Sequence, residues 1–292
     1  MTKKVLVTGS NGQLGCALKR LKNPYNSYIF FDRNSLDITN KEPTVNILKA
    51  IKPDYVVNCA AYTNVDKAET DREMSHFINV DGVDNIANAA WLAGSKLIHI
   101  STDYVFDGEK NEPYTRFDET NPINYYGETK RDGEISALCY PNTIVLRTSW
   151  LYSHTHNCFF TKILDNIKSG KLTRVKSYEI GSPTNADTLA EFIDFFIETD
   201  GFKDKSGIYH YANSGSASRF QFARTIQEIY NMLTKKNEHY IIGTTDRFLS
   251  EAKRPKYSVL DIKDTERDFG LEIQDWRIAL FRTCCEAINN DD

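Results

Sequence analysis

The sequence predicts an α/β protein whose parallel sheet is covered by helices on both faces. Short runs rich in apolar residues recur through the first half, and amphipathic stretches separate them; the runs lie at 4–8, 28–32, 54–58, 96–101 and 143–147. Nearly continuous apolar strands that alternate with helices are typical of a sheet buried on both sides. These observations therefore favour a doubly wound, Rossmann-like parallel sheet.

Beyond residue 150 the alternation loosens, and the sequence predicts a smaller second unit. Helices are expected at 157–169, 187–199, 218–233 and 274–288, and strands at 207–211 and 257–261. The strand at 207–211 is expected to return to the main sheet. We therefore expect one domain at 1–150 with returning segments near 182–212, and a partly interleaved α/β domain mainly at 151–292.

The composition excludes several classes of protein. The chain has 292 residues, 40% hydrophobic and 26% charged, and a net charge of −4 gives no electrostatic basis for binding nucleic acid. Apolar runs stay short of the ~20 residues that span a bilayer, and the N-terminus leads straight into a strand, so we expect a cytoplasmic protein without membrane contact. Six cysteines without C-x-x-C spacing argue against a zinc site or a disulfide framework.

The first connection predicts a phosphate-binding loop. Gly9, Gly12 and Gly15 form G-x-x-G-x-x-G between the first strand and a helical spacing of leucines. Glycines let a pyrophosphate approach bare backbone, and the N–H groups at the helix start favour its negative charge. Asp32 at the end of the second strand completes the context of a dinucleotide site.

The second connection bears on the choice of cofactor. Asp32 suits the free hydroxyls of the adenosine ribose and repels a 2′-phosphate, whereas Arg33 beside it can pair with that phosphate or stack on adenine. Either NADPH or NADH is therefore expected. Asp37 can bond the adenine amine, or it can instead cap the next helix.

The third and fourth connections supply small and hydroxyl side chains. Ala60 and Ala61 let the cofactor lie against the main chain, although they also suit a plain strand-to-helix connection. Ser101, Thr102 and Asp103 follow the fourth strand, where the carboxyl ends of parallel strands form a crevice. Thr102 can donate a hydrogen bond to a substrate carbonyl, or it can serve a local turn.

The segment "PINYYGETK" (122–130) predicts a tyrosine acid beside a lysine. Tyr126 and Lys130 are four residues apart and share one helix face, whereas Tyr125 is rotated away by about 100°. An ammonium group stabilises a tyrosinate, whose parent hydroxyl has a pKa near ~10. Tyr126 can then protonate a carbonyl oxygen while a nicotinamide delivers hydride to the carbon, and Thr102 supports the developing charge.

These motifs together resemble a known family. "VTGSNGQLG", "VVNCAAYTNVDKAE", "STDYVFDG", "YYGETKRDGE" and "LRTSWLYS" run in family order, and the likeness extends over nearly the whole chain. It is a resemblance to the extended short-chain dehydrogenase/reductases and, within them, to the dTDP-4-dehydrorhamnose reductases. It implies NADPH- or NADH-dependent reduction of the 4-keto group of dTDP-4-dehydro-6-deoxy-L-mannose to dTDP-L-rhamnose, for surface polysaccharide.

The motifs and the resemblance together assign the site residues. The catalytic set is Thr102, Tyr126 and Lys130. The expected cofactor-binding residues are Gly9, Asn11, Gly12, Gln13, Leu14, Gly15, Asp32, Arg33, Asp37, Ile38, Ala60, Ala61, Tyr62, Thr63, Tyr126 and Lys130. The expected substrate-binding residues are Thr102, Asp103, Trp150, Arg219 and Arg254, with the arginines as partners for the diphosphate. Trp150 can alternatively be plain core between the domains.

Two alternative functions remain open, and one position differs from the pattern of the resembled family. The chain can be another nucleotide-sugar 4-ketoreductase or an epimerase, or a non-catalytic regulatory homologue, although Asp103 followed by Tyr104 is not the acid pair of a 4,6-dehydratase. Some members of the resembled family are dimers that hold Mg²⁺ through a glutamate two residues beyond the third glycine. That position is Ala17, so we expect no metal and a monomer or weak homodimer.

Overall fold

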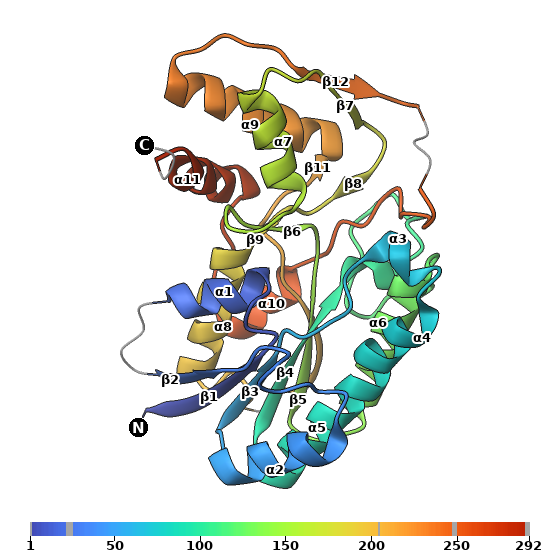
Figure 1. Ribbon diagram of the computed structural model, residues 1–292, viewed down its shortest axis with the longest axis vertical. Helices are drawn as coiled ribbons and strands as arrows, with labels where there is room; N and C mark the ends of the chain where they lie inside the picture. Colours follow the sequence, from blue (N-terminus) through green and yellow to red (C-terminus); the bar gives the residue numbers. More distant parts are fainter. Residues whose placement is uncertain (1, 22–25, 204, 247–249, 290–292) are drawn as a thin grey trace.

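A parallel sheet of six strands forms the lower half of the molecule (Figure 1). The computed structural model describes residues 2–21, 26–203, 205–246 and 250–289. The strands are β1 (Lys3–Thr8), β2 (Asn26–Phe30), β3 (Tyr55–Asn58), β4 (Lys96–Thr102), β5 (Thr143–Thr148) and β10 (Gly207–His210), in the order β10-β5-β4-β3-β1-β2. All neighbouring pairs are parallel, which confirms the predicted fold class.

Helices cover both faces of this sheet because successive strand residues point to opposite sides. Val5 and Val7 pack towards α1 (Gln13–Arg20) and α8 (Ala186–Glu198), whereas Leu6 between them packs towards α2 (Lys41–Ile51) and α5 (Gly82–Ala93). The second face also carries α6 (Tyr125–Leu138), and α3 (Val65–Ala68), α4 (Arg72–His76) and the π-helix η1 (Phe77–Asp81) lie beside it. The strands are therefore buried on both sides, as their continuous apolar sequence predicts.

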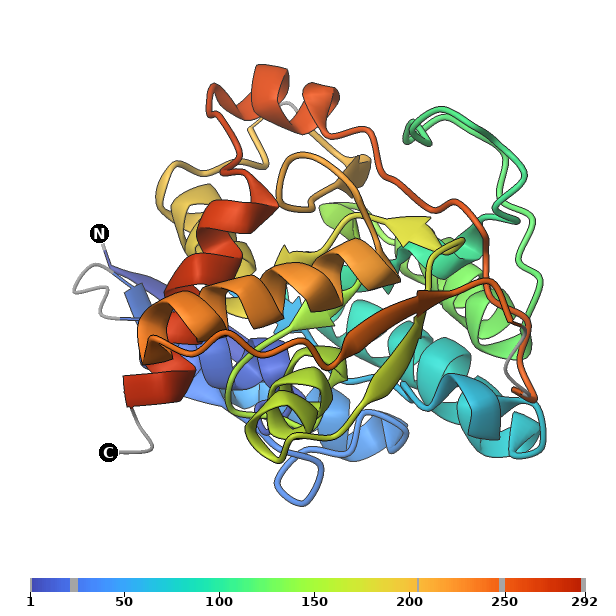
Figure 2. The ribbon, with the colours of Figure 1, turned by 90° about the horizontal axis from the view of Figure 1, so that it is seen from above.

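The second half builds a separate hydrophobic core above the sheet. Figure 2 shows α7 (Phe159–Lys168), α9 (Arg219–Thr234) and α11 (Trp276–Asn289) gathered there. Their core centres on Phe160, Phe222 and Trp276. Short strand pairs complete this part: β6 (Leu151–Tyr152) with β9 (Thr184–Asn185), β8 (Ile180–Gly181) with β11 (Ala217–Ser218), and β7 (Thr173–Lys176) with β12 (Ile241–Thr244).

The predicted elements of the second half meet different outcomes. β10 pairs with β5, which confirms the return of the chain to the main sheet. The strand expected at 257–261 is wrong: Tyr257 and Leu260 make only isolated bridges, with Ile180 and Tyr114. Each of these residues pairs with a different part of the chain, so the segment does not form a continuous ladder with one neighbouring strand. One further helix, α10 (Lys263–Phe269), was not predicted from the sequence.

The order of the strands creates a crevice at one edge of the sheet. β1 lies between β2 and β3, so the chain leaves β1 in one direction and later returns on its other side. At such a switch point the connections after neighbouring strands diverge, and ligands bind beyond the carboxyl ends. The glycine loop follows β1 and the small residues follow β3, so both face this crevice.

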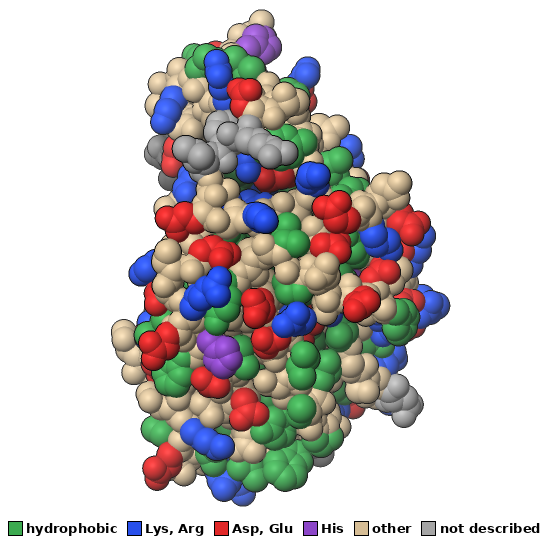
Figure 3. Space-filling view, turned by 90° about the vertical axis from the view of Figure 1, so that its right-hand side faces the viewer, with side chains coloured by type: hydrophobic (Ala, Val, Ile, Leu, Met, Phe, Trp, Pro, Cys, Tyr) green, Lys and Arg blue, Asp and Glu red, His purple; other side chains and the backbone are tan. Residues whose placement is uncertain are grey.

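The surface carries mixed charge. Figure 3 shows Lys, Arg, Asp and Glu side chains interspersed over much of one face, with hydrophobic side chains gathered towards its lower end. Neither sign of charge dominates this face. Among the residues that the structure describes, none of the helices is long and apolar enough to span a membrane.

A buried ion pair fastens α6 to the sheet. The Glu134 carboxylate accepts two hydrogen bonds from Arg147 of β5, at 2.9 and 2.7 Å, and a third from Ser101 of β4, at 2.5 Å. The Arg147 and Glu134 side chains are only 2% and 3% exposed. Removing one member of such a pair leaves the other charge buried without its partner, which is strongly destabilising.

We expect Glu134→Gln to lower the free energy of unfolding by roughly 3–5 kcal/mol, because the charge of Arg147 stays buried without its counter-ion. Urea denaturation followed by circular dichroism measures this. Glu228→Gln is the matched control, since its pair with Arg224 is 59–64% exposed and contributes less than about 1 kcal/mol. Equal destabilisation by the two variants would contradict the anchoring role of Glu134.

Candidate functional site

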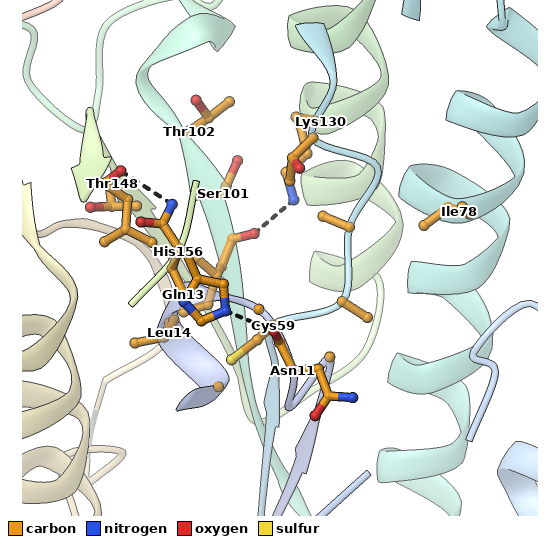
Figure 4. Close-up of a pocket in the computed structure, with 18 of the residues that line it drawn as sticks. Asn11, Gln13, Leu14, Cys59, Ile78, Ser101, Thr102, Lys130, Thr148 and His156 are labelled. Carbon is orange, nitrogen blue, oxygen red and sulfur yellow. Dashed lines mark hydrogen bonds between the residues drawn. The ribbon is translucent and has the colours of Figure 1, made fainter. Parts of the chain in front are cut away.

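A cleft of about 830 Å³ opens at the carboxyl ends of the strands. Its walls come from the connections after β1, β2, β3 and β4, from the first turns of α6, from the segment that follows β5, and from Arg219 of the second half. Figure 4 shows side chains from these segments facing one another across it. The cleft is thus the meeting place of both halves of the chain.

The glycine loop is shaped by close backbone contacts. Gly9 has a φ of +61°, and a Cβ there would lie 2.6 Å from the Ala60 nitrogen. A Cβ on Gly15 would lie 2.5 Å from the Cα of Ser10. Only glycine fits these two positions, and the loop can therefore turn directly into α1. The residues at the N-terminus of this helix, Gly12 to Gly15, line the cleft, and the first N–H groups of a helix lack partners within it. This end of the cleft suits a pyrophosphate.

The acidic and basic residues after β2 line the same cleft. The Asp32 carboxylate accepts hydrogen bonds from Ser35 at 2.7 Å and from Asn11 at 3.1 Å, and these bonds lower the pKa of Asp32. Arg33 is 70% exposed and lies 3.6 Å from Asp37. Asp32 is therefore an oriented acceptor, while Arg33 projects beside it.

Asp37 does not cap the following helix. Asn40 holds the N-cap position of α2, and the Asp37 carboxylate instead accepts hydrogen bonds from the amide and hydroxyl of Thr39. The interpretation of Asp37 as the cap of the next helix is therefore wrong. Asp37 and Ile38 both line the cleft.

The connection after β3 forms the floor of the cleft. Ala60, Ala61 and Thr63 line it, and a hydrogen bond from the Ala60 amide to Asn58 fixes the start of this connection. Tyr62 does not line the cleft. Its hydroxyl bonds Asp71 and its amide bonds Asn79, so its ring is directed away.

The geometry of α6 separates the two tyrosines. Asn124 caps the helix by accepting from the Gly127 amide at 2.8 Å, and a Cβ on Gly127 would lie 2.1 Å from the Tyr104 carbonyl oxygen. The helix therefore begins in close contact with the connection after β4. Tyr126 and Lys130 both line the cleft, whereas the Tyr125 ring lies outside it under the guanidinium of Arg72, at 4.6 Å.

The ionisable groups of α6 are shifted by burial. Lys130 is 2% exposed, its ammonium donates to the Ile100 carbonyl at 2.7 Å, and burial lowers its pKa to about 8 while Glu134 opposes the shift. Burial also raises the pKa of Tyr126, opposed by a hydrogen bond with Thr102 and reinforced by Asp103 and Tyr104. The sequence predicts that Lys130 lowers the pKa of Tyr126, but in the structure burial dominates and the pKa is raised. Tyr126 therefore stays protonated and can donate its proton.

Thr102 and Asp103 form a buried polar pair at the end of β4. The Thr102 hydroxyl donates to Asp103 at 3.1 Å and accepts from the Tyr104 amide at 3.2 Å. Asp103 also accepts from Ser149 at 2.9 Å and Ser258 at 2.6 Å. Burial raises the pKa of the Asp103 carboxyl, and the hydrogen bonds oppose that shift.

Of the predicted substrate residues from Trp150 onwards, two line the cleft and one does not. The Arg219 guanidinium stacks on the Trp150 ring, 3.5 Å from its centroid, and a Cβ on Gly181 would lie 2.5 Å from the same ring. Trp150 has a φ of +48° and lines the cleft with Arg219, so it is more than core between the halves. Arg254 lies outside the cleft lining and pairs with Asp66 at 2.7 Å.

Part of the cleft wall consists of residues that were not predicted from the sequence. Cys59, Ile78, Thr148, Leu151, His156 and Asn157 line it as well. His156 reaches the glycine loop, where its Nε2 lies 2.9 Å from the Asn11 carbonyl oxygen (Figure 4). Cys59, Thr148 and Leu151 stand inside the quoted motifs, but their side chains carry no predicted role there. No motif marks His156 and Asn157, because their position depends on how the second half folds back over the first.

Another cluster bears on the metal question. His154, Asp187 and Glu286 bring one potential ligand atom each within 4.8 Å of one another. The expectation of no metal rests on Ala17 and on the spacing of the cysteines, not on these three residues. Ala17 is buried, and it offers no oxygen ligand. The absence of a metal therefore stays a prediction.

Comparison with known proteins places the chain in a family. Residues 3–288 match the family model described as RmlD substrate binding domain. A dTDP-4-dehydrorhamnose reductase of Sinorhizobium fredii is 34% identical over 94% of this chain and 94% of its own length, and that of Escherichia coli K12 is 35% identical over 95% and 96%.

A solved structure agrees in fold over nearly the same length. It is a dTDP-4-dehydrorhamnose reductase from Bacillus anthracis in complex with NADP, 35% identical, with a TM-score of 0.90 over 98% of this chain and 100% of that chain. The sequence relatives, the solved structure and the family model thus all match this chain over nearly its whole length. The chain belongs to the family described as RmlD substrate binding domain.

Proposed function

We propose that this chain is an NADPH- or NADH-dependent oxidoreductase that reduces dTDP-4-dehydro-6-deoxy-L-mannose to dTDP-L-rhamnose. The observation that carries the proposal is one cleft that joins the glycine loop to Thr102, Tyr126 and Lys130. Family membership supports the dTDP-sugar as substrate, and the relative in complex with NADP supports the cofactor. The product would serve surface polysaccharide synthesis in the cytoplasm.

The residues present fit a dinucleotide. The N-terminus of α1 and the bare glycine backbone would hold the pyrophosphate, and Asp32 would accept from the adenosine ribose. Arg33, exposed beside them, would meet a 2′-phosphate. The cofactor supplies the hydride when bound, and every other requirement of the reaction falls on the side chains of this protein.

Tyr126 would deliver the proton. As a carbonyl carbon gains hydride, its oxygen becomes an alkoxide that is far more basic than a phenol, so a protonated tyrosine can transfer its proton directly. Burial keeps Tyr126 protonated at neutral pH. The buried Lys130, charged below a pKa of about 8, would stabilise the tyrosinate that remains. The Thr102 hydroxyl, which donates to Asp103 in this structure, would turn to donate to the carbonyl oxygen.

The second half would hold most of the sugar nucleotide. Arg219 is a cation at the cleft and would meet the diphosphate, while the neighbouring Trp150 ring offers an apolar surface to a deoxysugar. Asp103 would bond a sugar hydroxyl. Residues 1–150 with the returning segments would thus bind mainly the cofactor, and 151–292 mainly the substrate. We also propose a monomer or weak homodimer that needs no metal.

The second candidate function is that of another nucleotide-sugar ketoreductase or of an epimerase that uses the same cleft. The configuration of the product depends on the shape of the sugar pocket, which the catalytic side chains alone do not determine. A non-catalytic homologue is disfavoured, because Tyr126 and Lys130 both face the cleft.

We expect purified protein to oxidise NADPH when dTDP-4-dehydro-6-deoxy-L-mannose is added, with dTDP-L-rhamnose as the product by NMR. Tyr126→Phe should lower kcat by roughly 10²–10⁴-fold, because the proton donor is lost, and should leave NADPH binding intact. Nicotinamide fluorescence measures both quantities.

Tyr125→Phe is the matched control and should keep most activity, since Tyr125 lies outside the cleft. Equal losses in the two variants, or a greater loss from Tyr125→Phe, would show that the acid is wrongly assigned. A wild-type protein that leaves NADPH unoxidised with this sugar would refute the proposed function.

Arg33→Ala should weaken the use of NADPH by roughly three- to tenfold and leave NADH almost unchanged, because only NADPH carries a 2′-phosphate for the guanidinium. Steady-state kcat/KM for the two cofactors measures the selectivity. Arg224→Ala, on the exposed part of α9, is the control. Equal changes for both cofactors would place Arg33 away from the 2′ position.

A further inference from the structure

The segment 151–156 is tied to the glycine loop across the rim of the cleft. Gln13 donates to the Leu151 carbonyl at 3.3 Å and accepts from the Ser153 hydroxyl at 3.2 Å. The Nε2 of His156 lies 2.9 Å from the Asn11 carbonyl oxygen. Figure 4 shows His156 extending from the second half of the chain towards this loop. Residues 151–156, on the other side of the cleft, thus hold the loop that suits the pyrophosphate.

The partners of His156 define its role as a donor. A carbonyl oxygen can only accept, so Nε2 must carry the proton in this contact. Nδ1 lies 2.9 Å from the Thr155 hydroxyl, which can donate to it, and Arg20 in turn lies 3.4 Å from that hydroxyl. The imidazole is therefore held at both nitrogens, with one N–H directed at the backbone of Asn11.

Asn11 connects this contact to Asp32. The Asn11 amide group donates to the Asp32 carboxylate at 3.1 Å, and its side-chain oxygen accepts from Lys19 at 3.1 Å. His156 fixes the backbone of the same residue. A chain of hydrogen bonds therefore runs from His156 through Asn11 to the carboxylate proposed to bind the adenosine ribose.

We propose that His156 is a cofactor-positioning residue: it holds Asn11 so that the glycine loop and Asp32 are arranged for the dinucleotide before it binds. The inference rests on the proposed dinucleotide site. His156 lies at the phosphate end of the cleft and is not part of the Tyr126–Lys130 pair. Its loss should therefore weaken cofactor binding and leave proton transfer unchanged.

His156→Ala is expected to raise the Kd and KM for NADPH by roughly three- to tenfold, the effect of one lost hydrogen bond. The kcat at saturating NADPH should stay unchanged. Fluorescence titration gives Kd, and initial rates at varied NADPH give KM and kcat. A general structural defect would lower kcat as well, so this split identifies positioning.

Two further variants distinguish the Nε2 contact from mere loss of volume. His156→Gln places an amide N–H near the position of Nε2 and should restore most of the affinity. His156→Asn places its amide near Nδ1, too short to reach Asn11, and should resemble His156→Ala. His76→Ala is a control on α4, where His76 is exposed and lies outside the cleft lining.

Each outcome decides the matter. Wild-type affinity in His156→Ala, no recovery in His156→Gln, or a fall in kcat without a change in KM would overturn the role of His156 and leave the proposed function standing. Failure of the wild-type protein to bind NADPH would overturn the dinucleotide site itself, and this inference with it.

Discussion

The buried ammonium of Lys130 is the constraint on which the arrangement of the cleft depends. It donates to the Ile100 carbonyl of β4 and thereby ties the first turns of α6 to the sheet. One turn further along, Glu134 stands in a buried pair with Arg147 of β5. A charge removed from water in this way is tolerated only with partners in fixed positions. The same contacts therefore align the helix and fix the position of the Lys130 charge in the wall of the cleft.

Close approach of backbone makes this burial possible. A Cβ on Gly127 would lie 2.1 Å from the Tyr104 carbonyl oxygen, and one on Gly133 would lie 2.1 Å from that of Asn79. Both glycines stand on α6, so the helix can lie directly against its neighbours. Lys130 stands between these glycines on the helix and is buried, and this burial is the physical reason that its pKa falls.

The sequence predicted the features that local patterns encode. Alternating apolar runs gave the doubly wound sheet, and the helical spacing of Tyr126 and Lys130 correctly placed both at the cleft and Tyr125 outside it. It could not predict the partners that side chains find through tertiary packing. Arg254 pairs with Asp66, far away in sequence, and His156 reaches Asn11 from the other half of the chain. Residue type and spacing carry no signal for such pairings.

The most direct test of this account is the titration of Lys130 itself. NMR of protein labelled with ¹³C at the lysine ε-carbon follows the pKa, and the spectrum of Lys130→Met assigns the signal. We expect a pKa of about 8 for Lys130, because burial disfavours the ammonium. A pKa of ~10.4, the value of a lysine in water, would show that Lys130 is solvated and that α6 does not hold its charge in the protein interior.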